Sequence, residues 1–174
     1  MVTPLATVED WPVYAGGPVP QDAQALLDAA SQNIVDYCGW PIGPHTVEGE
    51  EYDGEGQRVL SLRALAVTSV EEVRVDGTPV SGWRLSRRYG QLERTGGVWP
   101  EGFGRIEVDY LAGFDPVPPN LVKLTVELAA KAAAVPLDVS SETMDRRTIR
   151  YREAAVVGGL DAAALERYRL GARP

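Results

Sequence analysis

The sequence predicts an α+β fold in which helices pack with a small antiparallel β-sheet, between an extended N-terminal arm and a C-terminal tail with a short helix. Two segments with apolar residues at helical spacing predict the helices, and short alternating runs between them predict the sheet. Glycine-containing turns separate those runs. The 174 residues are enough to bury a core without disulfides.

The N-terminal region contains a flexible stretch followed by a helix. Residues 1–20 hold four prolines and a Gly-Gly pair, which predicts an extended arm until a partner binds it. From Gln21 onward, apolar residues recur at helical spacing. The members of this apolar face are Ala23, Leu26, Leu27, Ala30, Ile34, Tyr37 and Cys38. Gly39 and the following Trp40-Pro41 pair end the predicted helix.

The middle of the chain predicts a loop and then the sheet. Residues 43–57 are acidic, glycine-rich and poor in apolar anchors, so we expect an exposed loop or a long hairpin. From residue 58 to residue 110 the pattern changes to short runs of period two, typical of strands. The Asp76-Gly77 pair between two of these runs favours a tight hairpin turn.

A second helix and a tail complete the expected organisation. Proline residues precede a helical pattern whose apolar face comprises Leu121, Leu124, Leu128 and Ala132. Residues 161–170 predict a short helix with Asp161 as its N-cap. We therefore expect an arm at 1–20, a helix-sheet-helix core domain at 21–136 and a C-terminal tail at 137–174.

Charge is distributed unevenly along the chain. Residues 1–57 hold ten Asp or Glu residues and no Lys or Arg, and the net charge of the whole chain is −8. An acidic solvated surface explains this pattern without any partner. The alternative is electrostatic complementarity between these acidic residues, among them Glu50, Glu51, Asp53 and Glu55, and a neighbouring copy or another partner, together with repulsion of DNA phosphates.

Few residues are suited to catalysis or metal binding. His45 is the only histidine and Cys38 the only cysteine, so we expect no disulfide, no metal site, no cofactor and no enzymatic activity. The acidic residues of 48–55 do not follow the order of an EF-hand loop. The N-terminus lacks the pattern of a signal peptide, and no apolar run is long enough to cross a membrane. Synthesis in the cytoplasm is expected.

Arginine and tryptophan residues offer interaction surfaces. Arg146, Arg147, Arg150 and Arg152 surround Tyr151, and Arg87-Arg88 precede Tyr89. Because the chain is acidic overall, protein contacts are favoured over nucleic acid for these arginines. The four tryptophans also permit a small ligand-binding module that stacks on sugars, although tryptophans beside proline more often close a core or a subunit contact.

Eight short segments follow one another in a specific order along the chain. They are Cys38-Gly39-Trp40-Pro41, then residues 69–77, 83–85, 90–94, 96–100, 106–114 and 116–128, and finally Leu165 to Arg169. In this order they resemble the head-to-tail connector, or adaptor, proteins of long-tailed phages. The proline-rich arm and the acidic residues 49–56 depart from the family pattern.

The resemblance implies a structural role at the virion neck. It implies a dodecameric ring below the portal protein that extends the DNA channel toward a tail-side neck protein, with no sequence-specific DNA binding. It also implies that the C-terminal segment docks on the portal, and we expect Leu165, Arg167, Tyr168 and Arg169 to form this anchor. Another neck component, such as a tail-completion or stopper protein, is the nearest alternative.

Overall fold

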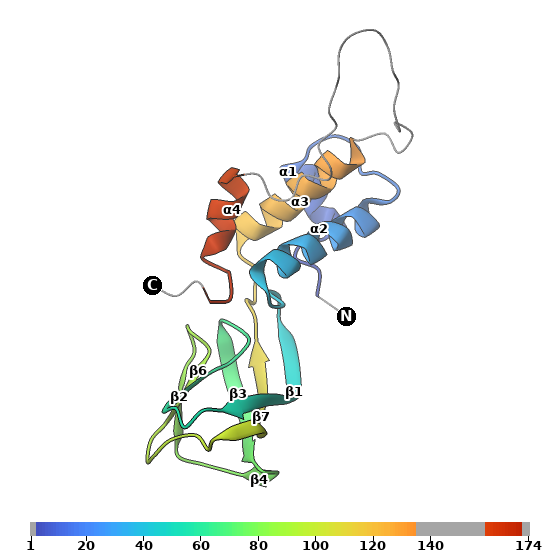
Figure 1. The fold of residues 1–174 in the computed structure, drawn as a ribbon. Helices are drawn as coiled ribbons and strands as arrows, with labels where there is room; N and C mark the ends of the chain where they lie inside the picture. Colours follow the sequence, from blue (N-terminus) through green and yellow to red (C-terminus); the bar gives the residue numbers. More distant parts are fainter. Residues whose placement is uncertain (1–2, 135–158, 172–174) are drawn as a thin grey trace, which may run out of the picture. The chain divides into compact units, whose positions relative to one another are not determined.

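A computed structural model of the protein describes residues 3–134 and 159–171, which fall into two compact units (Figure 1). Of the described residues, the strand unit comprises Thr3, 35–118 and 168–171, and the helical unit comprises 4–34, 119–134 and 159–167. The chain passes between the units at four places, after Thr3, Ile34, Pro118 and Arg167. These units divide the chain differently from the expected arm, core and tail.

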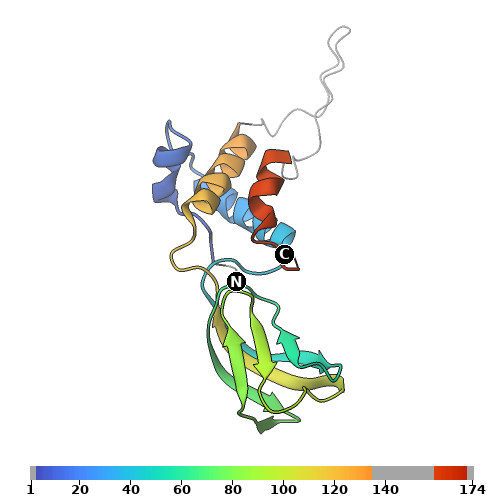
Figure 2. The same ribbon diagram turned by 90° about the vertical axis from the view of Figure 1, so that its left-hand side faces the viewer.

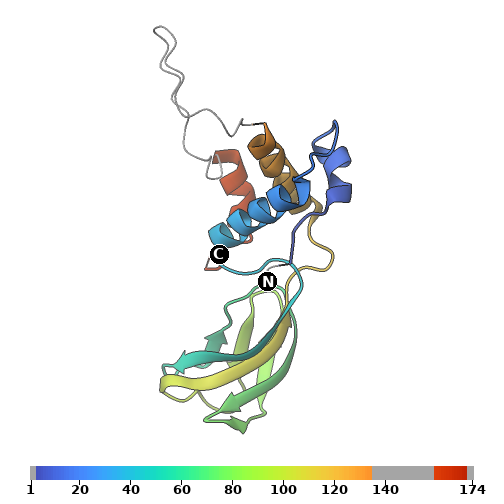
Figure 3. The same ribbon diagram turned by 90° about the vertical axis from the view of Figure 1, so that its right-hand side faces the viewer.

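The helical unit is built from the N-terminal segments and the last two helices (Figure 3). Its elements are η1 (Val8–Asp10), α1 (Trp11–Tyr14), α2 (Ala23–Cys38), α3 (Pro119–Ala133) and α4 (Gly159–Glu166), and the last four residues of α2 belong to the strand unit. One apolar cluster joins α1, α2 and α3. Its buried members are Ala6, Trp11, Ala23, Leu27, Ala30, Val126 and Ala129.

The expected arm is extended only in part, because residues 5–14 are packed within the helical unit. Leu5 and Trp11 are buried, and the Leu5 N–H donates to Ser31 Oγ on α2 at 3.1 Å. Asp10 accepts hydrogen bonds from both the N–H and the hydroxyl of Thr7, which caps the short helical turn. The many prolines suggested flexibility, whereas the buried apolar residues among them hold this segment in place.

Both predicted long helices are confirmed. The structure begins α2 two residues after Gln21 and ends it at Cys38, where Gly39 adopts a left-handed conformation (φ +79°) that favours glycine. On α3, Leu121 and Leu124 are buried as expected, but Leu128 is only half-buried and Ala132 is exposed. The predicted C-terminal short helix is also present, as α4.

The strand unit contains two antiparallel sheets (Figure 2). The larger has the order β1-β7-β3-β4 and the smaller the order β2-β6-β5. Their strands are β1 (His45–Gly54), β2 (Val59–Ser61), β3 (Val67–Val75), β4 (Thr78–Pro79), β5 (Trp83–Ser86), β6 (Gln91–Arg94) and β7 (Gly102–Ala112). Asp76 and Gly77 both have positive φ and form the predicted turn, between β3 and β4.

Alternation along β7 places the core of the strand unit on one face of the larger sheet. Ile106, Val108 and Tyr110 are buried, whereas Glu107 and Asp109 between them are partly exposed. Leu92 and Trp99 are fully buried in the same unit, and Trp99 Nε1 donates to the Leu92 carbonyl at 3.1 Å. The α+β class with a small antiparallel arrangement is therefore confirmed, with two sheets in place of one.

The expected acidic loop is wrong in its local structure. Residues His45–Gly54 form β1, an edge strand that pairs with β7 from His45↔Ala112 to Gly54↔Gly102. Acidic side chains lower the intrinsic preference for a strand. Pairing with β7 overrides that preference, because Tyr52 is buried and Val47 is half-buried along the strand.

Candidate assembly surfaces

Glu50 is the most constrained of the predicted acidic residues. Both Tyr52 and Tyr110 donate their hydroxyl hydrogens to Glu50 Oε2, and Arg63 Nη1 lies 3.5 Å from Glu50 Oε1. Burial raises the pKa of both tyrosines, and the hydrogen bond to Glu50 raises each pKa further. Glu50 is therefore part of the internal bonding of the strand unit as well as of its acidic surface.

The other three predicted acidic residues face solvent. Glu51, Asp53 and Glu55 are exposed, and Asp53 Oδ1 accepts a hydrogen bond from the Gly104 N–H at 2.7 Å. Within the part of the chain that the structure describes, no cation pairs with Glu51 or Glu55. Their charge is available to a partner.

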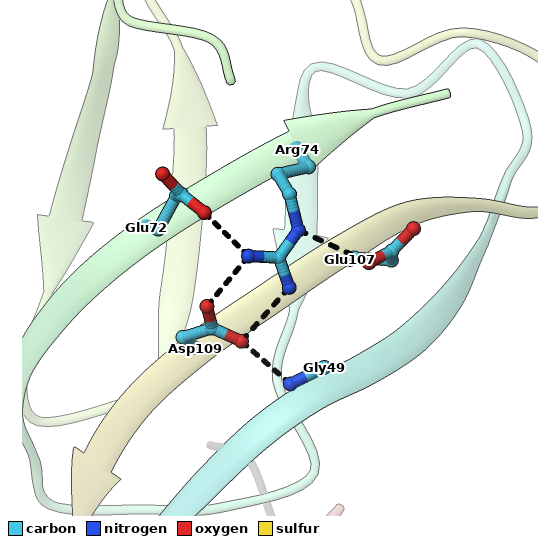
Figure 4. A network of polar contacts seen from close by, with 5 residues as sticks. All are labelled: Gly49, Glu72, Arg74, Glu107 and Asp109. Atoms are coloured by element: carbon cyan, nitrogen blue, oxygen red, sulfur yellow. Dashed lines mark hydrogen bonds and ion pairs between the residues drawn. The ribbon is translucent and has the colours of Figure 1, made fainter. Parts of the chain in front are cut away.

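A network of charged groups crosses three strands of the larger sheet (Figure 4). Arg74 on β3 bonds to Asp109 through Nη1 at 2.8 Å and Nη2 at 3.1 Å, and to Glu107 through Nε at 3.0 Å. It also bonds to Glu72, while the Gly49 N–H on β1 donates to Asp109. The hydrogen bonds from Arg74 are the largest cause that lowers the pKa of Asp109, and the hydrogen bond from the Gly49 N–H lowers it further. One cation faces three carboxylates, so this surface remains acidic.

The described basic residues include a small group without carboxylate partners. Arg84, Arg87 and Arg88 are exposed, and no described acidic residue forms an ion pair with them. The Arg88 guanidinium lies 5.4 Å from the centre of the Tyr89 ring. The predicted interface arginines, Arg146, Arg147, Arg150 and Arg152, lie outside the described residues.

Arg87 and Arg88 border an open, largely apolar hollow in the strand unit, which we call the apolar depression. Its volume is about 670 Å³, and it lies where β1 and β3 begin and β7 ends. The residues that line it are Pro44, His45, Ala66, Val67, Thr68, Arg87, Arg88, Leu111, Ala112, Gly113, Phe114 and Asp115. A mainly apolar hollow with a cationic border is suited to an apolar group beside an anion.

The exposure of Phe103 was not predicted from the sequence. Its side chain is 92% exposed at the start of β7, between Gly102 and Gly104. Sequence patterns identified these glycines only as turn residues. The available signal was a lone aromatic residue between two glycines, which have no side chain to cover it.

The predicted portal anchor divides into buried and exposed members. Leu165 is fully buried and Tyr168 is 8% exposed, whereas Arg167 and Arg169 are exposed. In the strand unit, Trp40 Nε1 donates to the Tyr168 carbonyl at 2.6 Å, and the Tyr168 ring meets Phe114 edge to face. The Leu170 N–H also donates to the Cys38 carbonyl at 2.8 Å. Of the four predicted anchor residues only the two arginines are exposed, and the Arg169 guanidinium lies 5.9 Å from the centre of the Tyr37 ring.

The residues considered for chemistry are engaged structurally. Cys38 is fully buried, and His45 Nδ1 lies 2.8 Å from the Gly43 carbonyl. Among the described residues no group of three or more His, Cys, Asp or Glu side chains is arranged to hold a metal ion. No described helix is both long and apolar enough to cross a membrane. Trp11, Trp40 and Trp99 are buried, which leaves only half-buried Trp83 for a sugar platform.

Comparison with known proteins gives one family and one group of structures. The sequence profile of the head completion protein family matches residues 4–132. The fold is similar to a chain in the neck of the empty gene transfer agent particle, computed with C6 symmetry, and to one in the neck of the native particle, computed with C12 symmetry. Each of these matches has a TM-score of 0.58 and 22% identity, and covers 100% of both chains.

A chain in the virion of the native gene transfer agent particle is also similar, with a TM-score of 0.57 and 22% identity over 97% of this chain and 89% of that one. No curated protein sequence matches at a significant level.

Proposed function

The chain belongs to the head completion protein family, and from this premise we propose that it forms a homo-oligomeric ring in the neck of a phage-type particle, between the portal and the tail. The family match over residues 4–132 carries the proposal, since it covers all the described strands, α2, and α3 except its last residue. Similarity to chains from necks computed with C6 and C12 symmetry supports a ring, and twelve copies is the number we expect.

The ring has a structural role and no enzymatic one. It would link head to tail and let DNA pass without reading its sequence. Carboxylates that line a channel would repel phosphate, and carboxylates at a subunit contact would pair with a neighbour's arginines. Glu50, Glu51, Asp53 and Glu55 serve one of these purposes in the proposal, and Arg146, Arg147, Arg150 and Arg152 serve the second.

The test of the ring is the mass of the assembly. We expect the protein to be present in isolated particles. We also expect native mass spectrometry of the purified protein to show a ring of about twelve copies when the portal protein is added. A protein that is missing from particles and stays monomeric with the portal would contradict the proposal. Binding to a tail-side protein in place of the portal would identify a different neck component.

Arg167 and Arg169 are proposed to dock on the portal, while Leu165 and Tyr168 hold the segment that carries them. The double variant Arg167→Glu/Arg169→Glu should reduce portal binding at least tenfold in a pull-down titration. Lys123→Glu/Lys131→Glu on α3 makes the same charge change and should leave binding unaltered. Equal binding by both double variants would contradict the docking role.

A further inference from the structure

We propose that Phe103 of one copy inserts into the apolar depression of the next copy, so that one repeated contact between strand units joins the subunits. The proposal rests on the neck ring and adds to it the residues that make the subunit contact. It requires a protruding apolar group and a hollow that accepts it. It also requires that this group cannot reach the hollow of its own copy, and that the two surfaces carry opposite charges. The strand unit supplies all four.

The protruding group is Phe103, and hydrogen bonds on both sides hold its turn. Asp53 accepts from the Gly104 N–H at 2.7 Å, and Arg105 Nη1 donates to the Glu101 carbonyl at 2.8 Å. Gly104 has a positive φ of +60°, which a residue with a side chain rarely adopts. The 92% exposed ring is therefore presented on an ordered turn, which lowers the entropy lost when a partner covers it.

The accepting hollow is the apolar depression. Val67, Leu111 and Phe114 contribute to its lining, and Leu111 is 39% exposed there. Its volume of about 670 Å³ is larger than an aromatic side chain needs, so the neighbouring turn residues can enter with the ring. Aromatic side chains in pockets are the usual anchors of protein interfaces.

The two features lie at opposite ends of β7, whose course can be followed in Figure 1. Phe103 is next to the first residue of the strand, and the Leu111-Ala112 pair that borders the depression ends it. At about 3.3 Å per residue, the eight steps between Phe103 and Leu111 span roughly 25 Å. A copy cannot fill its own depression. A contact between unlike surfaces of identical copies generates a ring when the rotation closes.

Charge is complementary at the same two ends. Asp53 bonds to the Phe103 turn, and Gly54 pairs with Gly102, which places the acidic end of β1 beside that turn. Glu51, Glu55 and Glu101 are exposed there, and no described cation pairs with them. Arg87, Arg88 and Asp115 line the depression, and neither arginine forms an ion pair with a described carboxylate, so the charge there is positive by one. Docking would place these opposite charges together.

Cysteine cross-linking in assembled particles tests the contact directly. Thr68 is exposed and lines the depression, and Glu101 is exposed on the Phe103 turn, so Glu101→Cys/Thr68→Cys, which keeps the Phe103 ring, should give a ladder of disulfide-linked oligomers up to the full ring on a non-reducing gel. The control Thr78→Cys/Thr68→Cys uses an exposed residue of β4, an edge strand two strands away from β7. It should give less than a tenth of the cross-linked product, since a disulfide needs Cα atoms within about 7 Å.

Charge reversal gives a second readout. Glu55→Lys/Glu101→Lys and Arg87→Glu/Arg88→Glu should each reduce ring formation at least tenfold, and combining the four changes should restore it. Particles that contain the protein but yield no specific cross-link, or cross-link Glu101→Cys to a different protein, would overturn the contact and leave the neck assignment standing. Failure of the combined variant to recover would also overturn it. Wild-type protein missing from particles would overturn both proposals.

Discussion

Asp109 shows how a single carboxylate stabilises the larger sheet. It receives hydrogen bonds from Arg74 on β3 and from the Gly49 N–H on β1, and these lower its pKa. A carboxyl with a lower pKa in the folded state contributes stability above its unfolded pKa of about 3.9. That contribution is lost as the pH falls through the lower folded value. Acid should therefore weaken the joining of β1, β7 and β3.

The first prediction concerns this pH dependence. Asp109→Asn should lower the free energy of unfolding at pH 6 and flatten its decrease between pH 5 and pH 2, as measured by urea denaturation at each pH. Glu48→Gln on β1 is the control, because it removes an exposed carboxylate that forms no hydrogen bond or ion pair with a described residue. A wild-type slope in Asp109→Asn would contradict the role of the Arg74 bonds.

The second prediction concerns the close approach of two backbones at Gly54. A Cβ added there would lie 1.6 Å from the Pro100 carbonyl oxygen, so one segment would have to move. Gly54→Ala should destabilise the protein by about 1 to 3 kcal/mol, the usual effect of overpacking. Gly96→Ala, whose added Cβ meets nothing within 4 Å, should change stability by less than about 0.5 kcal/mol. Equal chemical-denaturation midpoints for the two variants would argue against the clash.

At the level of elements, α1 is held by its apolar contacts more than by its length. Four residues cannot form a stable helix alone, and Trp11 supplies the large buried side chain that joins α1 to α2 and α3. Trp11→Ala should cost about 3 to 5 kcal/mol of stability. Val13→Ala, at a position 72% exposed on the same helix, should cost little. Thermal unfolding followed by circular dichroism measures both, and similar losses would place α1 outside the core.

Sequence periodicity predicted the two long helices, but it did not predict β1, a strand whose pairing partner is distant in the chain. The helices α2 and α3 each repeat their apolar face over three or more turns, which makes the pattern unambiguous. The strand β1 was predicted as a loop because its acidic residues obscure the alternation. Its partner β7 begins 48 residues after β1 ends, so nothing local in the sequence specifies their pairing.

Among the candidate interaction surfaces, only the charged ones could be predicted from the sequence. The acidic group of β1 and the pair Arg87-Arg88 were visible in the sequence as interaction residues. The burial of Leu165 and Tyr168 was not visible there, and Trp40, whose Nε1 donates to the Tyr168 carbonyl, lies far away from Tyr168 in the chain. The exposure of Phe103 was equally hidden, since an aromatic residue beside a strand is usually buried.

For the whole molecule, the fourth prediction is a salt-dependent assembly. Interactions between exposed charges are screened over about 10 Å at 0.1 M salt and about 3 Å at 1 M. Raising the salt concentration from 0.1 M to 1 M should raise the dissociation constant of the ring at least tenfold, as measured by sedimentation. Arg87→Gln/Arg88→Gln should assemble more weakly and lose most of this salt dependence. Unchanged salt dependence in that variant would mean that other charges dominate the contact.

The four passages of the chain between the strand unit and the helical unit have a mechanical consequence. A linker made of one segment would bear any tension between the units through a single backbone. Here the chain crosses after Ile34 and returns after Pro118, so two covalent connections link the bodies of the units, while the crossings after Thr3 and Arg167 lead only to short terminal segments. Cutting either of the two inner connections would still leave the units tethered by the other.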